Sequence, residues 1–151
     1  RDLRMSRGLG DVYKRQKHVR ILGPERSATQ IELAQTDCRN IGIKAPVRSS
    51  GDTKGTPGVT LRGPNGTLTV PEGVMIADRH IHMTPAQAAA FGLADGDRVQ
   101  VKIDGPKPGV MGGVLIRAND KCALDFHIDT DDGNAFLLKQ GQLVTVLGKE
   151  E

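Results

Sequence analysis

The chain has 151 residues, a formal net charge of +3, 3% aromatic residues and 19 glycines. The excess positive charge is confined to residues 1–16, which hold five of the 21 basic and two of the 18 acidic side chains. The folded part is therefore neutral, which excludes the basic, aromatic-bearing surface that binds nucleic acid. No apolar run is long enough to cross a membrane, so we expect a soluble, cytoplasmic protein with no membrane partner.

Residues 1–16 differ from the rest of the sequence. They show neither helical nor strand periodicity, and their last seven residues, Gly-Asp-Val-Tyr-Lys-Arg-Gln, resemble a translated sequencing adaptor. We therefore expect a foreign, disordered tail. On this view the native sequence begins near Lys17, inside a strand, and lacks its own N-terminal part.

The next sixty residues predict short strands separated by turns. Alternating apolar residues indicate strands over 18–22, 29–33 and 74–77, whereas 47–57 has the composition of a loop. One helical turn is expected within 35–43, with Thr36 or Asp37 as N-cap and Gly42 as its stop. Strands over 59–62 and 67–70 flank an Asn-Gly turn and predict a hairpin.

The second half continues in the same way. A strand carries His80 and His82, and Thr84, Pro85 and Gln87 then give the signature of a capping box before a helix over 86–91. A second short capped helix is predicted over 129–135. The remaining predicted strands are 98–103, 110–116, 123–128 and 142–147.

Many short strands with few helices predict a mainly β protein with short helices, built from two small β-barrel domains of which the first is incomplete. We assign 17–72 to the first domain and 73–151 to the second, with strands free to cross between the barrels. The division is expected in the loop at 48–58 or at the junction at 71–79.

Three of the four histidines lie in two predicted strands. Because side chains two apart in a strand share a face, His80 and His82 project side by side. With His127 from another strand they would give three imidazoles and one open coordination position, which is typical of catalytic zinc. The alternative, that each is an ordinary structural histidine, is equally compatible with this spacing.

The two cysteines, Cys38 and Cys122, are not expected to form a disulfide in a chain without a secretory signal. Cys122 lies five residues before His127. We interpret it as a small buried side chain on a strand, in preference to a ligand or nucleophile.

Several segments, in this order, resemble the phosphate propanoyltransferase family of bacterial microcompartments, whose members are phosphotransacylases. The resemblance covers residues from Lys17 to about Ala135. The segments that carry it are 19–32 (VRILGPERSATQIE), 45–52 (APVRSSGD), 55–58 (GTPG), 79–85 (RHIHMTP) and 127–131 (HIDTD).

The resemblance implies two β-barrel domains, a dinuclear zinc site, and transfer of a propanoyl or acetyl group between coenzyme A and inorganic phosphate. It makes His80, His82 and His127 the ligands of one zinc and Glu32 a ligand of the other, and Arg26 the residue that binds phosphate. The family has an upstream Asn-Arg-His-x-His motif for the second zinc, which this chain lacks. One zinc site therefore looks complete. The resemblance also implies a possible homo-oligomer, and shell or lumen enzymes of a microcompartment as partners.

Without the resemblance, other roles are open for these polar residues. Arg26 suits a surface salt bridge with Glu25, and Glu32 a solvated strand position whose polar face it shares with Gln30. Asp125 and Asp129 both suit a contact to an imidazole N–H. Equally, Asp125 suits a salt bridge in a loop and Asp129 suits a helix cap. Two alternatives to a phosphate acyltransferase remain, a zinc-dependent hydrolase and a non-catalytic, zinc-stabilised fragment.

Overall fold

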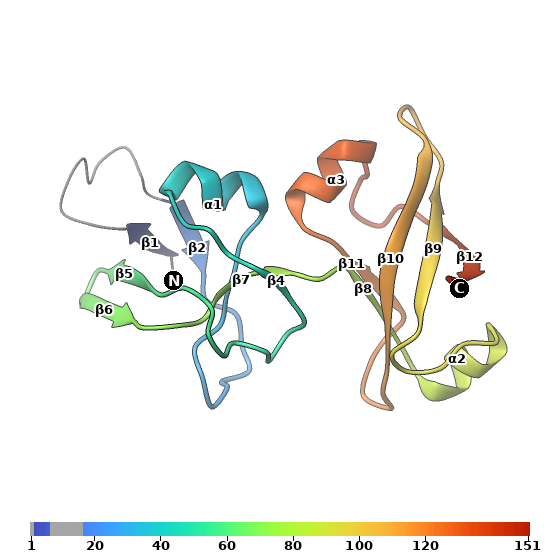
Figure 1. Ribbon diagram of the computed structural model, residues 1–151, viewed down its shortest axis with the longest axis horizontal. Helices are drawn as coiled ribbons and strands as arrows, with labels where there is room; N and C mark the ends of the chain where they lie inside the picture. The colour runs from blue at the N-terminus through green and yellow to red at the C-terminus, as the bar shows by residue number, and fades with distance from the viewer. Residues whose placement is uncertain (1, 7–16) are drawn as a thin grey trace. The chain divides into compact units, whose positions relative to one another are not determined.

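The computed structural model describes residues 2–6 and 17–151 and, from Lys17 onward, their side chains. The chain divides into two compact units, Arg1–Ala77 and Asp78–Glu151 (Figure 1). Each unit has its own hydrophobic core. Each unit is built from short strands with one or two short helices. The expectation of a mainly β protein is therefore confirmed.

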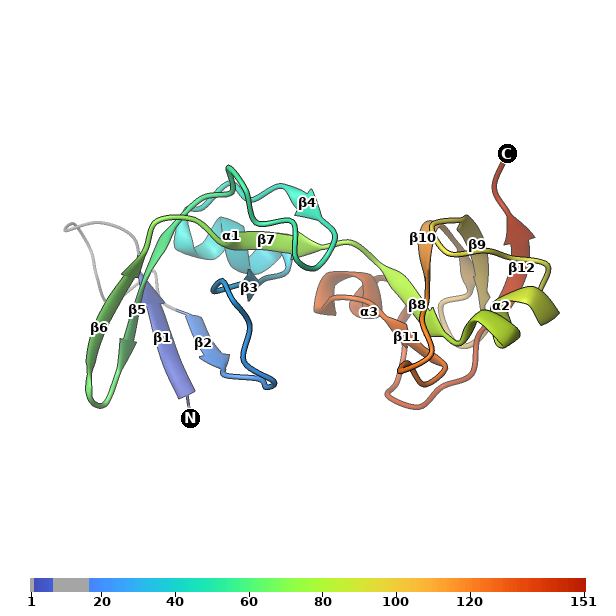
Figure 2. The same cartoon turned by 90° about the horizontal axis from the view of Figure 1, so that it is seen from below.

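The first unit contains an antiparallel sheet and a small parallel one. The antiparallel sheet has the order β2-β1-β5-β6, and Figure 2 shows these strands side by side. The parallel sheet has the order β3-β7-β4. The elements are β1 (Asp2–Ser6), β2 (Lys17–Arg20), β3 (Ile31–Glu32), α1 (Gln35–Ile41), β4 (Val47–Arg48), β5 (Val59–Gly63), β6 (Gly66–Val70) and β7 (Val74–Ala77).

Strand β1 corrects part of our expectation for residues 1–16. Asp2–Ser6 is not irregular but forms a strand between β2 and β5, pairing antiparallel with both. Backbone pairing on both sides satisfies the strand's N–H and C=O groups whatever its side chains are, so side-chain periodicity gave no signal. Residues 7–16 lie outside the described residues, and the foreign origin of the segment stays a prediction.

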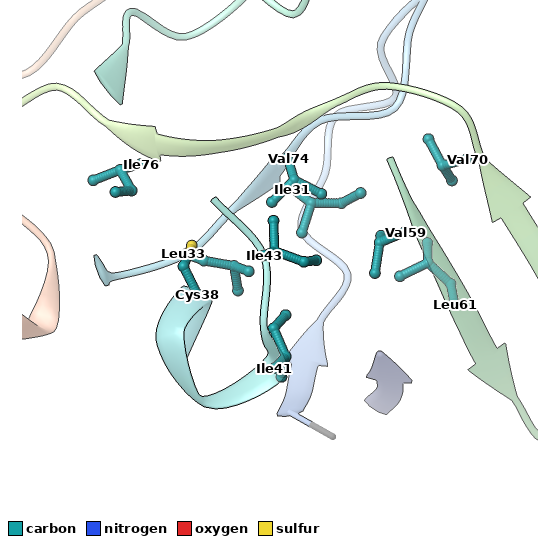
Figure 3. Packing of buried hydrophobic residues seen from close by; sticks show 10 residues of the cluster. All are labelled: Ile31, Leu33, Cys38, Ile41, Ile43, Val59, Leu61, Val70, Val74 and Ile76. Atoms are coloured by element: carbon teal, nitrogen blue, oxygen red, sulfur yellow. The ribbon is translucent and has the colours of Figure 1, made fainter. Parts of the chain in front are cut away.

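Apolar side chains from both sheets and from α1 meet in the first core (Figure 3). Cys38 and Val74 in this core are completely buried. Gly73 shows how tightly the chain packs beside it, because a Cβ at this position would lie 2.4 Å from the backbone oxygen of Thr29. Gly73 also has a φ of +135°, which L side chains rarely adopt.

Two local details of this unit differ from the predictions. The N-cap of α1 is Ala34, without a side-chain cap, in place of Thr36 or Asp37, whereas Gly42 ends the helix as expected with φ 74°. The hairpin β5–β6 forms as predicted, but Gly63 pairs with Gly66. Its two loop residues are therefore Pro64 and Asn65.

The second unit is one five-stranded sheet with two helices. The strand order is β11-β8-β10-β9-β12, so β11 and β12 are its edges. Only the β8–β10 pair is parallel. The elements are β8 (His80–Met83), α2 (Pro85–Ala90), β9 (Arg98–Ile103), β10 (Gly109–Ala118), β11 (Asp125–His127), α3 (Thr130–Phe136) and β12 (Thr145–Lys149).

Alternation in the sequence sets the two faces of this sheet. Val99, Val101 and Ile103 of β9 are fully buried, and the residues between them are exposed. Both predicted helices begin where their caps indicated. The Thr84 side chain accepts from Gln87 N and the Gln87 side chain accepts from Thr84 N, while Asp129 accepts from Asp132 N at the start of α3.

The predicted barrel closure is not found in the described residues, where three sheets are separate and each retains two edge strands. Across the same residues, the three helices have six or seven residues each, and none is long and apolar enough to span a membrane.

Candidate metal centre

Strand β8 brings two imidazoles together by simple alternation. Ile81 and Met83 are 3% and 0% exposed and belong to the second core. His80 and His82 point to the opposite face, where their Nε2 atoms lie 3.1 Å apart. Two nitrogens bound to one tetrahedral zinc at its usual bond length would be separated by about 3.3 Å. The pair is thus already spaced as two ligands of one ion.

The third imidazole comes from strand pairing. β11 pairs antiparallel with β8, and the register sets His127 directly opposite His80 and Asp125 opposite His82. The three ring centroids form a nearly equilateral triangle with sides of 4.7, 5.0 and 4.9 Å. One nitrogen from each ring lies within 4.8 Å of the other two.

Each ring also has a hydrogen-bond partner outside the three histidines. His80 Nδ1 donates to the backbone oxygen of Asp78 at 2.8 Å, so its Nε2 keeps the lone pair. His127 Nε2 lies 3.1 Å from the Asp125 carboxylate and donates to it. His82 Nδ1 lies 3.2 Å from the sulfur of Cys122. Outer contacts of this kind orient imidazoles that bind metals.

A further ion pair supports the residue that holds His80. Arg98 of β9 contacts the carboxylate of Asp78 at 2.6 Å, and its other nitrogen donates to the backbone oxygen of Gly113. Arg98 thus restrains the side chain of Asp78, whose backbone carbonyl accepts from His80. Arg98 therefore acts on the His80 imidazole only through Asp78.

The environment of His82 favours the neutral form of its imidazole. Burial lowers the pKa of His82 below its ordinary value. Its neighbours His80 and His127, when protonated, and Arg117 lower this pKa further, whereas the Asp125 carboxylate raises it. Neutral imidazole is the form that binds a metal ion. The donor set, the nitrogen spacing and the outer partners all fit a divalent ion such as zinc, with His80 9% exposed and His127 on the surface.

The first unit gathers the other predicted site residues in a polar cluster. Arg26 Nη1 and Gln30 Nε2 both donate to the Ser50 hydroxyl at 2.9 Å. Gln30 also donates to the Glu32 carboxylate and accepts from Gly51 N at 2.7 Å. The shared polar face of Gln30 and Glu32 is thus present, and in the described part of the chain no salt bridge joins Arg26 to Glu25.

Gln30 and Ser50 were not predicted as site residues, although both lie in segments that carry the resemblance. Gln30 links Glu32 to Ser50, and Ser50 links this strand segment to Arg26. The signal available in the sequence was their polarity beside the predicted ligands. Local spacing does not show that the loop carrying Ser50 lies against the segments carrying Arg26 and Gln30.

An apolar groove of about 630 Å³ lies on the other face of the β8–β11 pair. Its walls include Ile81 and Phe126, and the segment that leads into β12, where Leu143 is 91% exposed. The histidines do not line this groove.

Comparison with known proteins agrees with the motifs. Residues 10–139 match the family model described as phosphate propanoyltransferase. This chain belongs to the phosphate propanoyltransferase family. The match begins at residue 10, inside the segment that we expected to be foreign.

Individual family members give the extent of the likeness. The chain is 46% identical to a phosphate propanoyltransferase of Thermotoga maritima over 132 residues, which are 87% of this chain and 63% of the relative. It is 48% identical to one of Salmonella typhimurium over 120 residues, 79% of this chain and 57% of the relative. The chain thus spans about three fifths of the length of these phosphate propanoyltransferases.

Proposed function

We propose that this chain belongs to an enzyme that moves a short acyl group, propanoyl or acetyl, between coenzyme A and inorganic phosphate. The single observation that carries the proposal is the family match over residues 10–139. The arrangement of three imidazoles supports a metal-dependent form of this reaction, because their donor atoms suit zinc.

In the proposed reaction a phosphate oxygen attacks the thioester carbonyl, the carbon–sulfur bond breaks, and the thiolate of coenzyme A leaves. Zinc held by His80, His82 and His127 would supply Lewis-acid stabilisation of developing negative charge. Arg26 would bind phosphate through its planar, permanently charged guanidinium group. Its contact with Ser50 limits the orientations of that group.

Glu32 would be a ligand of a second zinc, together with imidazoles of the Asn-Arg-His-x-His motif that this chain lacks. Its contact with Gln30 supports this role, because the amide N–H orients the carboxylate and leaves its other oxygen available. Association with microcompartment enzymes and a homo-oligomeric state are proposals that rest on the resemblance alone.

We also infer that the five-stranded sheet closes into a barrel in the longer family members. Its edges are β11 and β12, and the apolar groove is lined by both of these strands and by the segment that leads into β12. A further strand supplied by the part of the relatives that lies outside the match would pair with these edges and cover the groove. Closure of this kind removes exposed strand edges.

The test is a thiol-release assay with propanoyl-CoA, in the presence and absence of phosphate. It uses this chain alone and a joined protein, in which the chain is extended by the part of the Thermotoga maritima relative that lies outside the match. We expect zinc-dependent and phosphate-dependent thiol release from the joined protein, and loss of most of this activity in Arg26→Met. His18→Ala changes a histidine that lies outside the cluster and serves as the control.

Two outcomes would contradict the proposal. A joined protein that binds zinc yet releases no thiol from any short acyl-CoA is not a transacylase. Release that proceeds equally well without phosphate would identify a zinc-dependent hydrolase instead, because water would then take the place of phosphate.

A further inference from the structure

The contact between Cys122 and His82 has no role in the function proposed above. Cys122 lies in the loop before β11, half-buried, and its sulfur is 3.2 Å from Nδ1 of His82. The Nε2 atom, on the other side of that ring, faces His80 at 3.1 Å. The sulfur therefore contacts the imidazole on the side away from the three-histidine cluster, where it is not placed to be a fourth ligand.

The hydrogen-bond directions follow from the neighbouring ring. His80 donates from Nδ1 to the backbone oxygen of Asp78, which only accepts, so Nε2 of His80 carries a lone pair. A neutral His80 therefore accepts from Nε2 of His82, and Nδ1 of His82 then accepts from the Cys122 thiol. Without metal, His82 is the Nε2–H tautomer and Cys122 is the donor.

A metal ion at the cluster requires the opposite arrangement at His82. Coordination through Nε2 removes the proton from that nitrogen, and a neutral ring then carries its proton on Nδ1. The proton that leaves Nε2 passes to water, and Nδ1 takes one up from water. The His82 ring therefore remains neutral and Cys122 remains a thiol. The Nδ1–H group now needs an acceptor, and a thiol sulfur is able to accept as well as donate.

We propose that Cys122 is a positioning residue of the metal centre, which donates to His82 in the metal-free protein and accepts from it when the metal is bound. This inference rests on the three-histidine metal site of the proposed function, and deepens it. Side chains that only accept, such as a carboxylate, would favour the Nδ1–H tautomer in both states, whereas Cys122 serves either one. Outer contacts of this kind typically change metal affinity by about 10- to 100-fold when removed.

The first test measures zinc affinity by competition with a chromophoric chelator. We expect Cys122→Ala to weaken zinc binding by about 10- to 100-fold, and Cys122→Ser to keep most of the affinity because a hydroxyl also donates and accepts. Cys38→Ala, in the core of the first unit, is the matched control and should leave zinc affinity unchanged. Circular dichroism establishes that each variant is folded. Equal zinc affinity in Cys122→Ala and the unchanged protein would overturn the proposal.

The second test is spectroscopic, and its first measurement uses the unchanged protein. Long-range ¹H–¹⁵N spectra of histidine-labelled protein should show His82 protonated on Nε2 without metal and on Nδ1 with zinc. Cobalt-loaded protein should lack an intense sulfur-to-cobalt charge-transfer band. A strong band that disappears in Cys122→Ala would make Cys122 a ligand and overturn the proposal, as would an unchanged tautomer of His82.

These results are separable from the acyltransferase assay. Cys122-dependent zinc affinity without phosphate-dependent thiol release would support the positioning role and reject the reaction. Unchanged protein that binds no zinc would reject the metal centre, and with it the role of Cys122.

Discussion

At the scale of single residues, the candidate metal centre depends on the hydrogen-bond partners of the three imidazoles as well as on the imidazoles themselves. The backbone of Asp78, the carboxylate of Asp125 and the thiol of Cys122 each contact one imidazole. Three different chemical groups thus orient three similar ligands. Each partner lies within five residues of one of the histidines, so short segments carry most of the site.

Replacing a ligand should abolish zinc binding without unfolding the second unit. We expect His82→Ala to lose zinc from a one-to-one complex, because two remaining imidazoles leave a tetrahedral ion under-coordinated. The measurement is equilibrium dialysis followed by metal counting. His18→Ala removes an exposed histidine of β2 and should keep the full zinc content. Equal zinc content in both variants would show that the cluster is not the binding site.

The residue-level predictions succeeded where spacing within one strand decides the outcome. His80 and His82 share a face because strand side chains alternate, and the structure confirms this arrangement. The expectation for Cys122 was wrong in part. We placed it on a strand as a buried apolar side chain, whereas it lies in a half-buried loop against His82. A loop conformation is decided by its contacts, which the local pattern does not contain.

At the scale of elements, the edge strand β12 is held to the sheet by an ion pair as well as by backbone pairing. Lys149 contacts the carboxylate of Asp97 at 2.7 Å, just before β9 begins. The hydrogen bond from Lys149 holds the pKa of Asp97 below its ordinary value, and a second hydrogen bond from Ala94 N lowers this pKa further. Asp97 thus joins β12 to the turn at 94–97.

The lowered pKa of Asp97 gives a pH dependence with a definite sign. An acid whose pKa is lower in the folded protein stabilises the fold above its unfolded value of 3.8, and this contribution is lost as pH falls through the folded pKa. We expect Asp97→Asn to lower the urea midpoint at neutral pH, with the difference from the unchanged protein shrinking below pH 3.8. Asp104→Asn makes the same charge change at an exposed pair. A difference that is constant with pH would contradict the prediction.

The cap of α2 tests a feature that the sequence alone predicted. Thr84→Ala removes the side-chain oxygen that accepts from Gln87 N, and should cost about 1 kcal/mol in the free energy of unfolding. Thr84→Ser keeps the oxygen and should lose much less. Urea denaturation followed by circular dichroism measures both. Equal losses in the two variants would mean that packing of the threonine methyl group, and not the cap, stabilises the start of this helix.

At the scale of the whole molecule, the chain consists of two units with separate cores, and it covers about three fifths of its relatives. The second unit carries the three clustered histidines. The edges of its sheet, β11 and β12, lie beside the apolar groove. A groove of this kind is stabilised when another segment covers it, which is the basis of the proposed barrel closure.

Leu143 distinguishes the open sheet from a closed one. In this chain Leu143→Asp should change the free energy of unfolding by no more than about 0.5 kcal/mol, as is usual for surface positions, because the side chain is 91% exposed. In the joined protein that carries the unmatched part of the Thermotoga maritima relative, the loss should reach about 1.5–3 kcal/mol if the side chain becomes buried. Chemical denaturation of both pairs is the measurement. Equally small effects in both proteins would argue against closure over this groove.

The sequence by itself determined the local features of this protein: most strands, the capped starts of α2 and α3, the paired orientation of His80 and His82, and the motifs that identify the family. These depend on alternation, on caps and on neighbouring residues, which a local window contains. The tertiary structure decided the opposition of His127 and His80, the approach of Cys122 to His82, and the open edges at β11 and β12. Those features depend on which strands pair and in which register, and pairing is selected by the burial of side chains far apart in the sequence.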